Sequence, residues 1–348
     1  MDKDIYFMNE ALAIAKAGIG KTGSNPSVGC VIVKDNKIIS SARTENGGRP
    51  HAESLAINKI QIKDLEESSI YITLEPCCIN KKYEISCVEK ILQSKFTRVI
   101  IGAIDPNPKI SGRSIEILKR NKIETISGVL KNECEEVIIG FKKRMLKNQP
   151  YITLKIATSL DGKIALINGK SKWITSEKLR KLSHKLRAKN DAILTGIGTV
   201  IADDPLLTYR SSDEQHDPIR IILDSDLRIS KDSQIVRTAD KIRTIIFTAQ
   251  TSKNLHSNIK IITVKKADSG LNLKDILKYI ANLGINNLLI EAGQKVNTSF
   301  IKENLVDKII LFQSKKIIGG DGLNVIGDLN LQNLNQCFEF KTEVISEN

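Results

Sequence analysis

Residues 51–54 have the sequence HAES, and residues 74–87 have the sequence LEPCCINKKYEISC. These stretches bring a histidine, acidic residues and three cysteines into one short segment of the chain. A catalytic zinc site needs three protein ligands and leaves a fourth position open for water. The bound ion lowers the pKa of that water to about 7, so that hydroxide is available at neutral pH. The two stretches therefore predict a hydrolytic zinc centre.

The order of these residues is typical of nucleobase deaminases, which carry His-x-Glu and, later, Pro-Cys and a further cysteine. His51, Cys77 and Cys87 are the expected metal ligands, and Glu53 is the expected catalytic proton shuttle. On a helix, His51 and Glu53 would point about 200° apart, which suits two different roles. A helix cap at His51 and inert, buried cysteines would explain single residues, but the complete ordered set favours zinc.

Outside this segment, apolar periodicity predicts alternating helices and strands. Met8, Ala11, Leu12 and Ala15 would share the buried face of a helix over 5–18. The other elements expected in the first half are strands at 28–35, 37–42, 69–74, 97–104 and 123–126, and helices at 51–60, from about 87, at 112–120 and at 130–146. Such alternation predicts a layered α/β domain.

A polar stretch closed by a proline, KNQP at 147–150, marks the expected domain boundary. Two domains are also the expectation for 348 residues, here 1–147 and 150–348. The second domain would contain strands at 151–157, 191–196, 218–224, 243–249, 259–264, 287–294 and 306–314, and helices at 176–188 and 273–283. Leu179, Leu182 and Leu186 would form the buried face of the helix over 176–188.

The composition narrows the function classes. A formal charge of +13 suits nucleic acid or phosphorylated small molecules, but aromatic residues, on which single-stranded nucleic acids stack, are only 4%. The first residues lack the apolar core of a signal peptide, and no apolar run is as long as a membrane span. We therefore expect a cytoplasmic protein whose six cysteines are reduced thiols or metal ligands and form no disulfide framework. We also expect a phosphorylated small-molecule substrate and no nucleic-acid or membrane partner.

Four stretches of the second half have the character of a small-molecule site. They are LKIATSLDGKIA at 154–165, SKWIT at 171–175, the segment 186–210 and IEAG at 290–293. Gly196 and Gly198 do not complete a Gly-x-Gly-x-x-Gly fingerprint, so no Rossmann fold is implied. Arg187 and Arg210 would suit a phosphate monoester, because guanidinium offers several donors in a fixed geometry.

Taken together, LEPC at 74–77 with its distant Cys87, NPSVGCVIV at 25–33 and these four stretches resemble the bifunctional riboflavin-biosynthesis deaminase–reductases. The resemblance covers nearly the whole chain. It implies a cytidine-deaminase-like three-layer domain that binds Zn²⁺, followed by a dihydrofolate-reductase-like domain that uses NADPH. Small α/β domains of this kind commonly assemble, so a homo-oligomer is expected.

The resemblance also implies site residues. Asn25 would contact the substrate of the deaminase. The residues that would contact the ribosyl-phosphate substrate of the reductase are Ser171, Arg187, Leu207, Arg210 and Glu291. The residues that would contact NADPH are Ala157, Trp173, Thr199, Asp203, Ser225, Gly293, Gln294, Lys295, Val296, Asn297, Thr298 and Ser299.

The chain departs from the family pattern in two places. Nine residues separate Cys77 from Cys87, and eight separate Cys78 from Cys87, whereas eight are usual in the family. We expect Cys77 to be the ligand because it directly follows Pro76, with Cys78 as the alternative. The loop 78–86 lacks the usual His, Gly, Arg and Pro-Pro residues, so its substrate contacts are not predicted. Gln294 stands where proline is common, although a helix N-terminus offers amide donors either way.

The implied reactions are hydrolysis of the 2-amino group of 2,5-diamino-6-(ribosylamino)pyrimidinone 5′-phosphate and then hydride transfer from NADPH to C1′ of the ribose. Lys155, Asp203 and Glu291 are the candidate proton donors in the reduction. Two alternatives remain: a reductase with an impaired or structural zinc site, because the loop 78–86 is atypical, and an RNA-editing deaminase with a basic binding domain. The wide cysteine spacing and the few aromatic residues argue against the latter.

Overall fold

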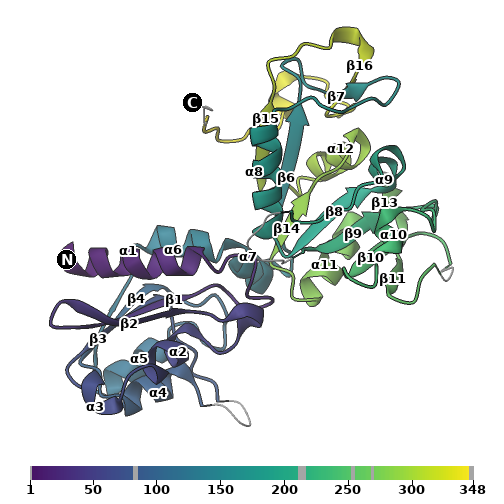
Figure 1. The fold of residues 1–348 in the computed structure, drawn as a ribbon. Helices are drawn as coiled ribbons and strands as arrows, with labels where there is room; N and C mark the ends of the chain where they lie inside the picture. The colour runs from purple at the N-terminus through teal and green to yellow at the C-terminus, as the bar shows by residue number, and fades with distance from the viewer. Residues whose placement is uncertain (1, 81–84, 211–216, 252–254, 268–269, 345–348) are drawn as a thin grey trace.

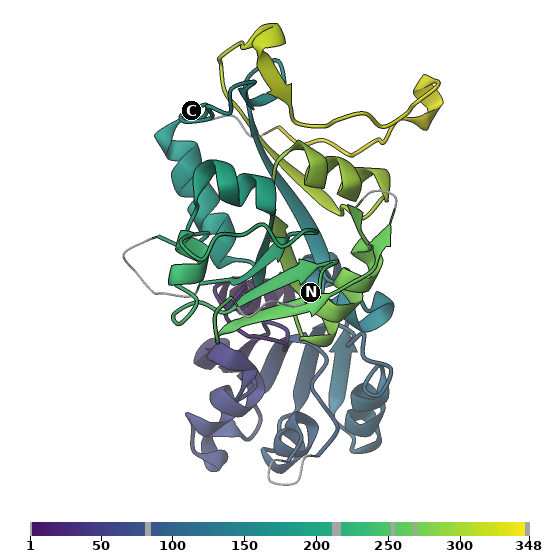
Figure 2. The same ribbon diagram turned by 90° about the vertical axis from the view of Figure 1, so that its right-hand side faces the viewer.

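The structure of the protein is a computed structural model that describes residues 2–80, 85–210, 217–251, 255–267 and 270–344. The chain forms two α/β units, each on its own large sheet, which meet near α7 (Ile139–Lys147) (Figures 1 and 2). The predicted boundary at 147–150 falls between the end of α7 and the start of β6 (Tyr151–Thr158).

The first sheet has five strands in the order β2-β1-β3-β4-β5. Its strands are β1 (Gly29–Lys34), β2 (Lys37–Arg43), β3 (Ser69–Leu74), β4 (Arg98–Ala103) and β5 (Glu124–Ser127). The strand β1 pairs antiparallel with β2 and β3, whereas β3, β4 and β5 are parallel. The central strands are buried along nearly their whole length because helices cover both faces of the sheet.

The helices of the first unit complete a three-layer arrangement, as expected. They are α1 (Asp2–Lys16), α2 (Ala52–Asn58), α3 (Ile62–Leu65), α4 (Cys87–Gln93), α5 (Arg113–Arg120), α6 (Lys131–Val137) and α7. The helices α1 and α6 cover one face of the sheet, and α2, α4 and α5 cover the other (Figure 1). Met8, Ala11, Leu12 and Ala15 are all buried under α1, which confirms the predicted face.

The second sheet has seven strands in the order β11-β10-β9-β8-β14-β6-β15, and every neighbouring pair is parallel. The strands after β6 are β8 (Ala192–Gly196), β9 (Ile219–Leu223), β10 (Thr244–Thr248), β11 (Ile259–Thr263), β14 (Asn287–Ile290) and β15 (Lys308–Gln313). The carboxyl ends of all seven strands therefore meet at one edge of the sheet, where α/β proteins bind ligands.

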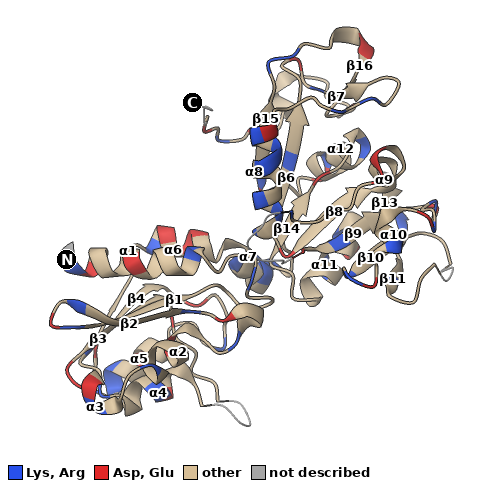
Figure 3. Ribbon diagram, viewed as in Figure 1, with Lys and Arg blue, Asp and Glu red and all other residues tan. Residues whose placement is uncertain are grey.

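Helices cover both faces of this second sheet. They are α8 (Glu177–Ala188), α9 (Ile197–Asp203), α10 (Gln234–Arg237), α11 (Leu273–Asn282) and α12 (Gln294–Lys302). One apolar core joins the sheet to α11 and α12, and the other joins it to α9 and α10. Short ribbons are formed by β7 (Lys163–Leu166) with β16 (Gly322–Asn324) and by β12 (Lys266–Ala267) with β13 (Gly270–Leu271). Lysine and arginine residues lie along α8 (Figure 3).

The sequence predictions for the helices over 130–146 and 176–188 were wrong in detail. The helix expected over 130–146 is interrupted at Ile138, where the chain turns so that Gly140 of α7 packs closely against Asn286 and Asn287. The face of α8 is also rotated: Leu182 is 44% exposed, whereas Ser183 is buried. The helix turns Ser183 and Arg187, four residues apart, toward the sheet, and this leaves Leu182 outside.

Candidate active sites

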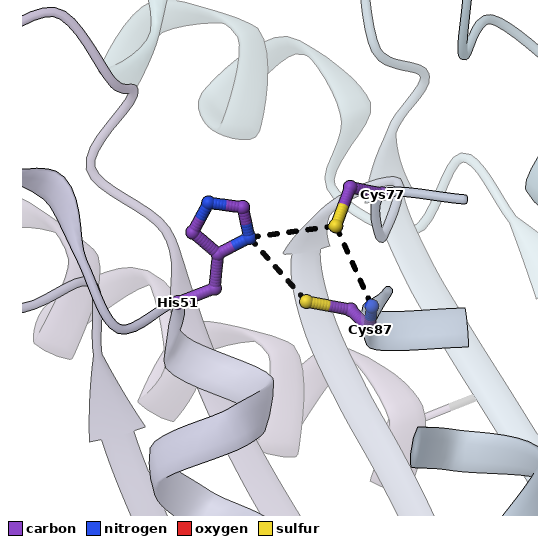
Figure 4. Close-up of side chains that lie close together, drawn as sticks. All are labelled: His51, Cys77 and Cys87. Atoms are coloured by element: carbon purple, nitrogen blue, oxygen red, sulfur yellow. Dashed lines mark hydrogen bonds between the residues drawn. The ribbon is translucent and has the colours of Figure 1, made fainter. Parts of the chain in front are cut away.

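The first candidate site lies where three elements of the first unit converge (Figure 4). His51 immediately precedes α2, Cys77 follows β3, and Cys87 is the first residue of α4. The Nδ1 atom of His51 lies 3.4 Å from Sγ of Cys87 and 3.6 Å from Sγ of Cys77. The backbone N–H of Cys87 donates to Sγ of Cys77 over 3.4 Å. One imidazole nitrogen and two sulfurs thus face a common point.

These distances fit a single zinc ion. In a tetrahedral site with bonds of about 2.3 Å to sulfur and about 2.0 Å to nitrogen, ligand atoms lie about 3.5 Å apart. Among the described residues, His51, Cys77 and Cys87 form the one group of three or more His, Cys, Asp or Glu whose ligand atoms all lie within 4.8 Å of one another. Cys78 is outside this group and packs, half-buried, against the apolar core.

The neighbours of the Cys77 sulfur favour its thiolate form. The hydrogen bonds with the Cys87 thiol and with His51 together lower the pKa of Cys77 to about 4, although burial opposes them. The hydrogen bond from the Cys87 thiol to the Cys77 sulfur raises the pKa of Cys87, and burial raises it further. The hydrogen bond to Cys77 raises the pKa of His51. A divalent cation would take the place of these protons, because metal ligands bind in their deprotonated forms.

Glu53 lies beside the metal group in the first turn of α2 and is 3% exposed. Burial raises the pKa of its carboxyl, the neighbouring His51 lowers it, and Cys77 raises it again. A raised pKa suits a carboxyl that takes and returns a proton near neutral pH. The expectation that His51 itself is helical was wrong: it is the N-cap, with φ −71° and ψ 158°, and this extended backbone aims its ring at the sulfurs.

Glu75 is a residue of this site that the sequence analysis missed. It is 2% exposed, and its carboxylate accepts hydrogen bonds from the backbone N–H groups of Asp105, Gly112 and Ser114 over 3.2, 2.9 and 3.1 Å. The hydroxyl of Ser114 donates to the carbonyl of Pro76 over 2.6 Å. These bonds fix the loop that follows β3. The sequence shows an acid directly before Pro-Cys, but its backbone partners at residues 105–114 are visible only in the structure.

Asn25 lies on the segment between α1 and β1 and contacts the segment that leads to His51. Its side-chain Nδ2 donates to the carbonyl of Gly48 over 2.9 Å. Its own carbonyl accepts from the hydroxyl of Thr22 over 2.8 Å. The Asn25 amide is therefore held in one orientation against the segment that precedes His51.

The second candidate site lies at the carboxyl edge of the seven-stranded sheet. Glu291 directly follows β14, and Arg187 of α8 donates to its two oxygens over 2.8 and 3.0 Å. Lys155 of β6 donates to the same carboxylate over 3.5 Å. Burial alone would raise the pKa of Glu291, but Lys155 and Arg187 together lower it to about 2. Glu291 is therefore ionised at neutral pH between two cations.

The other predicted substrate residues are Ser171, Leu207 and Arg210. The hydroxyl of Ser171 donates to the carboxylate of Asp203 over 3.2 Å. A predicted substrate residue is thus in contact with a predicted cofactor residue. Leu207 is buried with a left-handed φ of 54°. Arg187 donates to the carbonyl of Thr208, and the exposed Arg210 donates through Nε to the hydroxyl of Thr208 over 3.4 Å.

The predicted cofactor segment 293–299 divides into two sides. Gly293 precedes α12, and a methyl group added to it would lie 3.8 Å from the hydroxyl of Thr199. A cavity of about 340 Å³ is lined by Gln294, Lys295, Thr298, Ser299, Lys302, Gly327 and Asp328. Val296 instead packs against the core, and Asn297 is buried with its Nδ2 donating to the carbonyl of Val325. The sequence analysis missed the last three residues of the cavity, which nothing in their local pattern distinguished.

The remaining predicted cofactor residues come from separate strands and loops. Ala157 lies near the carboxyl end of β6, and Ser225 follows β9, where its carbonyl accepts from the backbone N–H of Ala249. The ring of Trp173 is 61% exposed and lies 4.3 Å from the guanidinium of Arg180. Trp173 is therefore not a core residue.

None of the helices in the described residues is long and apolar enough to cross a bilayer.

Comparison with known families accounts for both units. Residues 1–103 match the family model for the cytidine and deoxycytidylate deaminase zinc-binding region. Residues 150–346 match the family model for the RibD C-terminal domain. The riboflavin biosynthesis protein RibD of Aquifex aeolicus is 37% identical over 98% of this chain and 95% of its own length. RibD of Escherichia coli is 33% identical over 99% of this chain and 96% of its own length.

Solved structures agree in fold over the whole chain. RibD of Acinetobacter baumannii has a TM-score of 0.91 at 31% identity and covers 99% of this chain and 96% of its own. A deaminase/reductase of Thermotoga maritima has a TM-score of 0.88 at 34% identity and covers 98% of this chain and 94% of its own. With the His51–Cys77–Cys87 group on one sheet and the Glu291 site on the other, the chain belongs to the RibD family of riboflavin biosynthesis proteins, bifunctional enzymes in which a zinc-dependent deaminase precedes an NADPH-dependent reductase.

Proposed function

We propose that the protein removes the 2-amino group of 2,5-diamino-6-(ribosylamino)pyrimidinone 5′-phosphate by hydrolysis and then reduces the ribosyl group to a ribityl chain. The observation that carries the first step is the convergence of His51, Cys77 and Cys87 beside the buried Glu53. The Thermotoga maritima relative is named a diaminohydroxyphosphoribosylaminopyrimidine deaminase/5-amino-6-(5-phosphoribosylamino)uracil reductase, which supports the same substrates here.

In the deaminase, His51, Cys77 and Cys87 would hold the zinc ion, which supplies a water of lowered pKa. Glu53 is the proton shuttle: its carboxylate takes a proton from the attacking water and delivers one to the amine, which leaves as ammonia. The raised pKa of Glu53 supports this role, because the carboxyl must accept a proton readily at neutral pH. Asn25 would orient the pyrimidine ring, and Glu75 would hold the loop that presents Cys77.

In the reductase, Glu291 would accept hydrogen bonds from ribose hydroxyls, while Arg187 fixes its carboxylate. Arg210, which is exposed, would bind the phosphate with Ser171 and Leu207 beside it. The low pKa of Glu291 excludes it as proton donor, and among the three candidates we favour Lys155, an ammonium in contact with that carboxylate. The cofactor supplies the hydride, and the protein aligns its nicotinamide with C1′ of the substrate.

The NADPH site would combine the cavity beside α12 with the carboxyl ends of the central strands. The outward side chains of the segment 293–299 would face the cofactor, together with Ala157, Trp173, Thr199, Asp203 and Ser225. The basic residues along α8 would attract the two anionic ligands (Figure 3). We further propose that the catalytic units comprise 1–147 and 150–348, and that the protein is a cytoplasmic homo-oligomer that does not bind nucleic acid.

Ammonia release tests the deaminase half directly. The protein is incubated with the diaminopyrimidine phosphate without NADPH, and ammonia is measured. Glu53→Gln should keep its zinc and lose about 10²–10⁴-fold in rate, the range for general acid–base catalysis. NADPH oxidation on the deaminated substrate should be unchanged. Glu66→Gln, on the surface next to Lys95, is the matched control and should release ammonia normally.

Other outcomes favour the alternatives. Normal ammonia release by Glu53→Gln contradicts the role of that carboxyl. NADPH oxidation without any ammonia release from the parent protein indicates a reductase with an impaired zinc site. A shift of tRNA in a gel at physiological salt revives the RNA-editing deaminase, for which the chain has a charge of +13 but few aromatic residues.

A further inference from the structure

The two units are joined by hydrogen bonds that centre on Arg144 of α7. Its Nε donates to the side-chain oxygen of Asn286 over 2.7 Å, and its Nη2 donates to the carbonyl of Ser24 over 2.7 Å. The side-chain nitrogen of Asn286 donates to the carbonyl of Gly23 over 3.1 Å. Arg144 and Asn286 thus hold two successive carbonyls of the segment 22–25, which we call the substrate loop.

Asn286 is itself firmly held by the second unit. It is 4% exposed, and its backbone N–H donates to the carboxylate of Asp191 over 2.8 Å. Its carbonyl accepts from the backbone N–H of Tyr151 over 2.8 Å. The substrate loop of the deaminase unit therefore rests on a residue fixed between the first strands of the reductase sheet.

The two units pack closely at this contact. A Cβ atom added to Gly284 would lie 2.6 Å from the Cβ of Ser24, closer than real side chains approach. A Cβ added to Gly20, just before the loop, would collide with the carbonyl of Ala188 at the end of α8. Backbone therefore meets backbone at Gly20, and the backbone of Gly284 meets the side chain of Ser24.

The substrate loop continues to the deaminase site through Asn25. The Thr22 hydroxyl closes the loop on the Asn25 carbonyl, and Asn25 donates to the carbonyl of Gly48. A Cβ added to Gly48 would lie 2.5 Å from both Asn25 Nδ2 and the Thr22 carbonyl, so these residues fit together closely. Gly48 is three residues before His51.

We propose that Arg144 and Asn286 are positioning residues for deamination, which hold the substrate loop so that Asn25 meets the pyrimidine. This inference rests on the proposed function, because the contact of Asn25 with substrate comes from that proposal. Neither residue hydrogen-bonds a metal ligand or Glu53. The reductase unit therefore contributes to substrate affinity in the deaminase unit, and not to zinc binding or to proton transfer.

The test compares Arg144 and its partner Asn286 with Lys143, the neighbour of Arg144 on α7, in the full chain. Arg144→Met and Asn286→Asp are measured against Lys143→Met, which removes a different contact between the units, the 2.6 Å bond from Lys143 to Asp307. Asn286→Asp keeps the side-chain oxygen that accepts from Arg144 but removes the side-chain nitrogen that donates to the carbonyl of Gly23. Both test variants should raise the KM for deamination about tenfold, the effect of losing a hydrogen bond to a charged or buried group. Their kcat, zinc content and reductase kinetics should be unchanged.

The controls separate this inference from the function on which it rests. Lys143→Met should leave the KM for deamination unchanged, and Arg144→Lys should recover part of the affinity. Asn25→Ala should raise the same KM. A raised KM for Asn25→Ala with a normal KM for Arg144→Met and Asn286→Asp overturns the positioning role alone. A normal KM for all three overturns the substrate role of Asn25 as well, and an equal rise in Lys143→Met indicates general loosening of the contact instead.

Discussion

Two adjacent cysteines occupy different surroundings. Cys77 has His51 and Cys87 within hydrogen-bonding distance, whereas Cys78 packs, half-buried, against the apolar core. Counting residues along the chain could not separate them, because the loop 78–86 is longer than usual by one residue when counted from Cys77. The backbone after Pro76 separates them, since successive side chains point in different directions.

Replacing the sulfur of Cys77 or of Cys78 by oxygen tests which of the two cysteines binds zinc. Cys77→Ser should lose zinc, because alkoxide is not formed at neutral pH and the site keeps only two ligands. Cys78→Ser should retain one zinc per chain. The measurement is metal content after purification and exhaustive dialysis. Retention of zinc by the first variant and loss by the second would make Cys78 the ligand. Residues 81–84 of the intervening loop lie outside the described residues.

The site residues differ in how well the sequence predicts them. His51, Glu53, Cys77 and Cys87 form the ordered pattern expected of a zinc deaminase, and the structure brings the three predicted ligand residues together. Glu75 and Asn286 act through backbone groups thirty or more residues away, on other elements. Hydrogen bonds of that kind leave no pattern in the local sequence, so reasoning from motifs could not find them.

Among the elements, strands and helices were predicted well where burial is simple. The strand over 69–74 has the observed bounds, because both faces are covered and its apolar run is uninterrupted. The helix α8 shows the opposite case: its leucine spacing suggests a buried face, but the ion pair of Arg187 with Glu291 fixes its rotation. A buried ion pair on a helix thus overrode the apolar periodicity.

Arg220 of β9 is the buried cation that joins several elements. It is fully buried, and its guanidinium donates to the hydroxyls of Thr244 and Thr238 and to the carbonyls of Leu206, Ile235 and Ile242. Arg220→Met should lower the free energy of unfolding by about 3–5 kcal/mol, because buried acceptors lose their partner. Urea unfolding followed by circular dichroism measures the change. Arg237→Met, which removes an exposed pair with Asp232, should cost far less.

Asp191, at the start of β8, predicts a pH dependence. Its carboxylate accepts from the backbone N–H groups of Asn286 and Asn287, and burial raises its pKa to about 6. The unfolded value is about 3.9, so the folded state binds the proton more tightly. The stability that this group contributes is present below pH 4 and is lost as pH rises through 6.

Asp191→Asn should keep an acceptor oxygen without this loss. The difference in unfolding free energy between variant and parent should therefore move in favour of the variant, by up to about 2 kcal/mol, between pH 4 and pH 7. Urea titrations at a series of pH values measure it. A difference that is constant over this range would show that Asp191 stays ionised.

At the scale of the whole molecule, two chemistries occupy separate sheets. The metal group belongs to the five-stranded sheet, and Lys155, Arg187 and Glu291 belong to the seven-stranded one. The order of elements and the polar stretch at 147–150 allowed both units to be predicted. The contact between them could not be, because it depends on Gly20, Gly140 and Gly284, whose close approaches involve residues distant in the sequence.

Removal of zinc should therefore affect one reaction only. After dialysis against a chelator, ammonia release should fall to background, whereas NADPH oxidation on the deaminated substrate should keep its rate. Added Zn²⁺ should restore the first activity. Loss of both activities at once, with restoration of both by Zn²⁺, would show that the metal supports the whole fold.

The glycines between the units also limit how such enzymes can be recombined. At Gly20 and Gly140, even one methyl group would collide with backbone or side-chain oxygen of the other unit. A chimera that takes its first unit from one homologue and its second from another must therefore match in shape at these points. If one homologue has a larger residue at such a position and the second unit of the other homologue has no space for it, the two units of the hybrid would not pack correctly. Each parent protein would still fold normally.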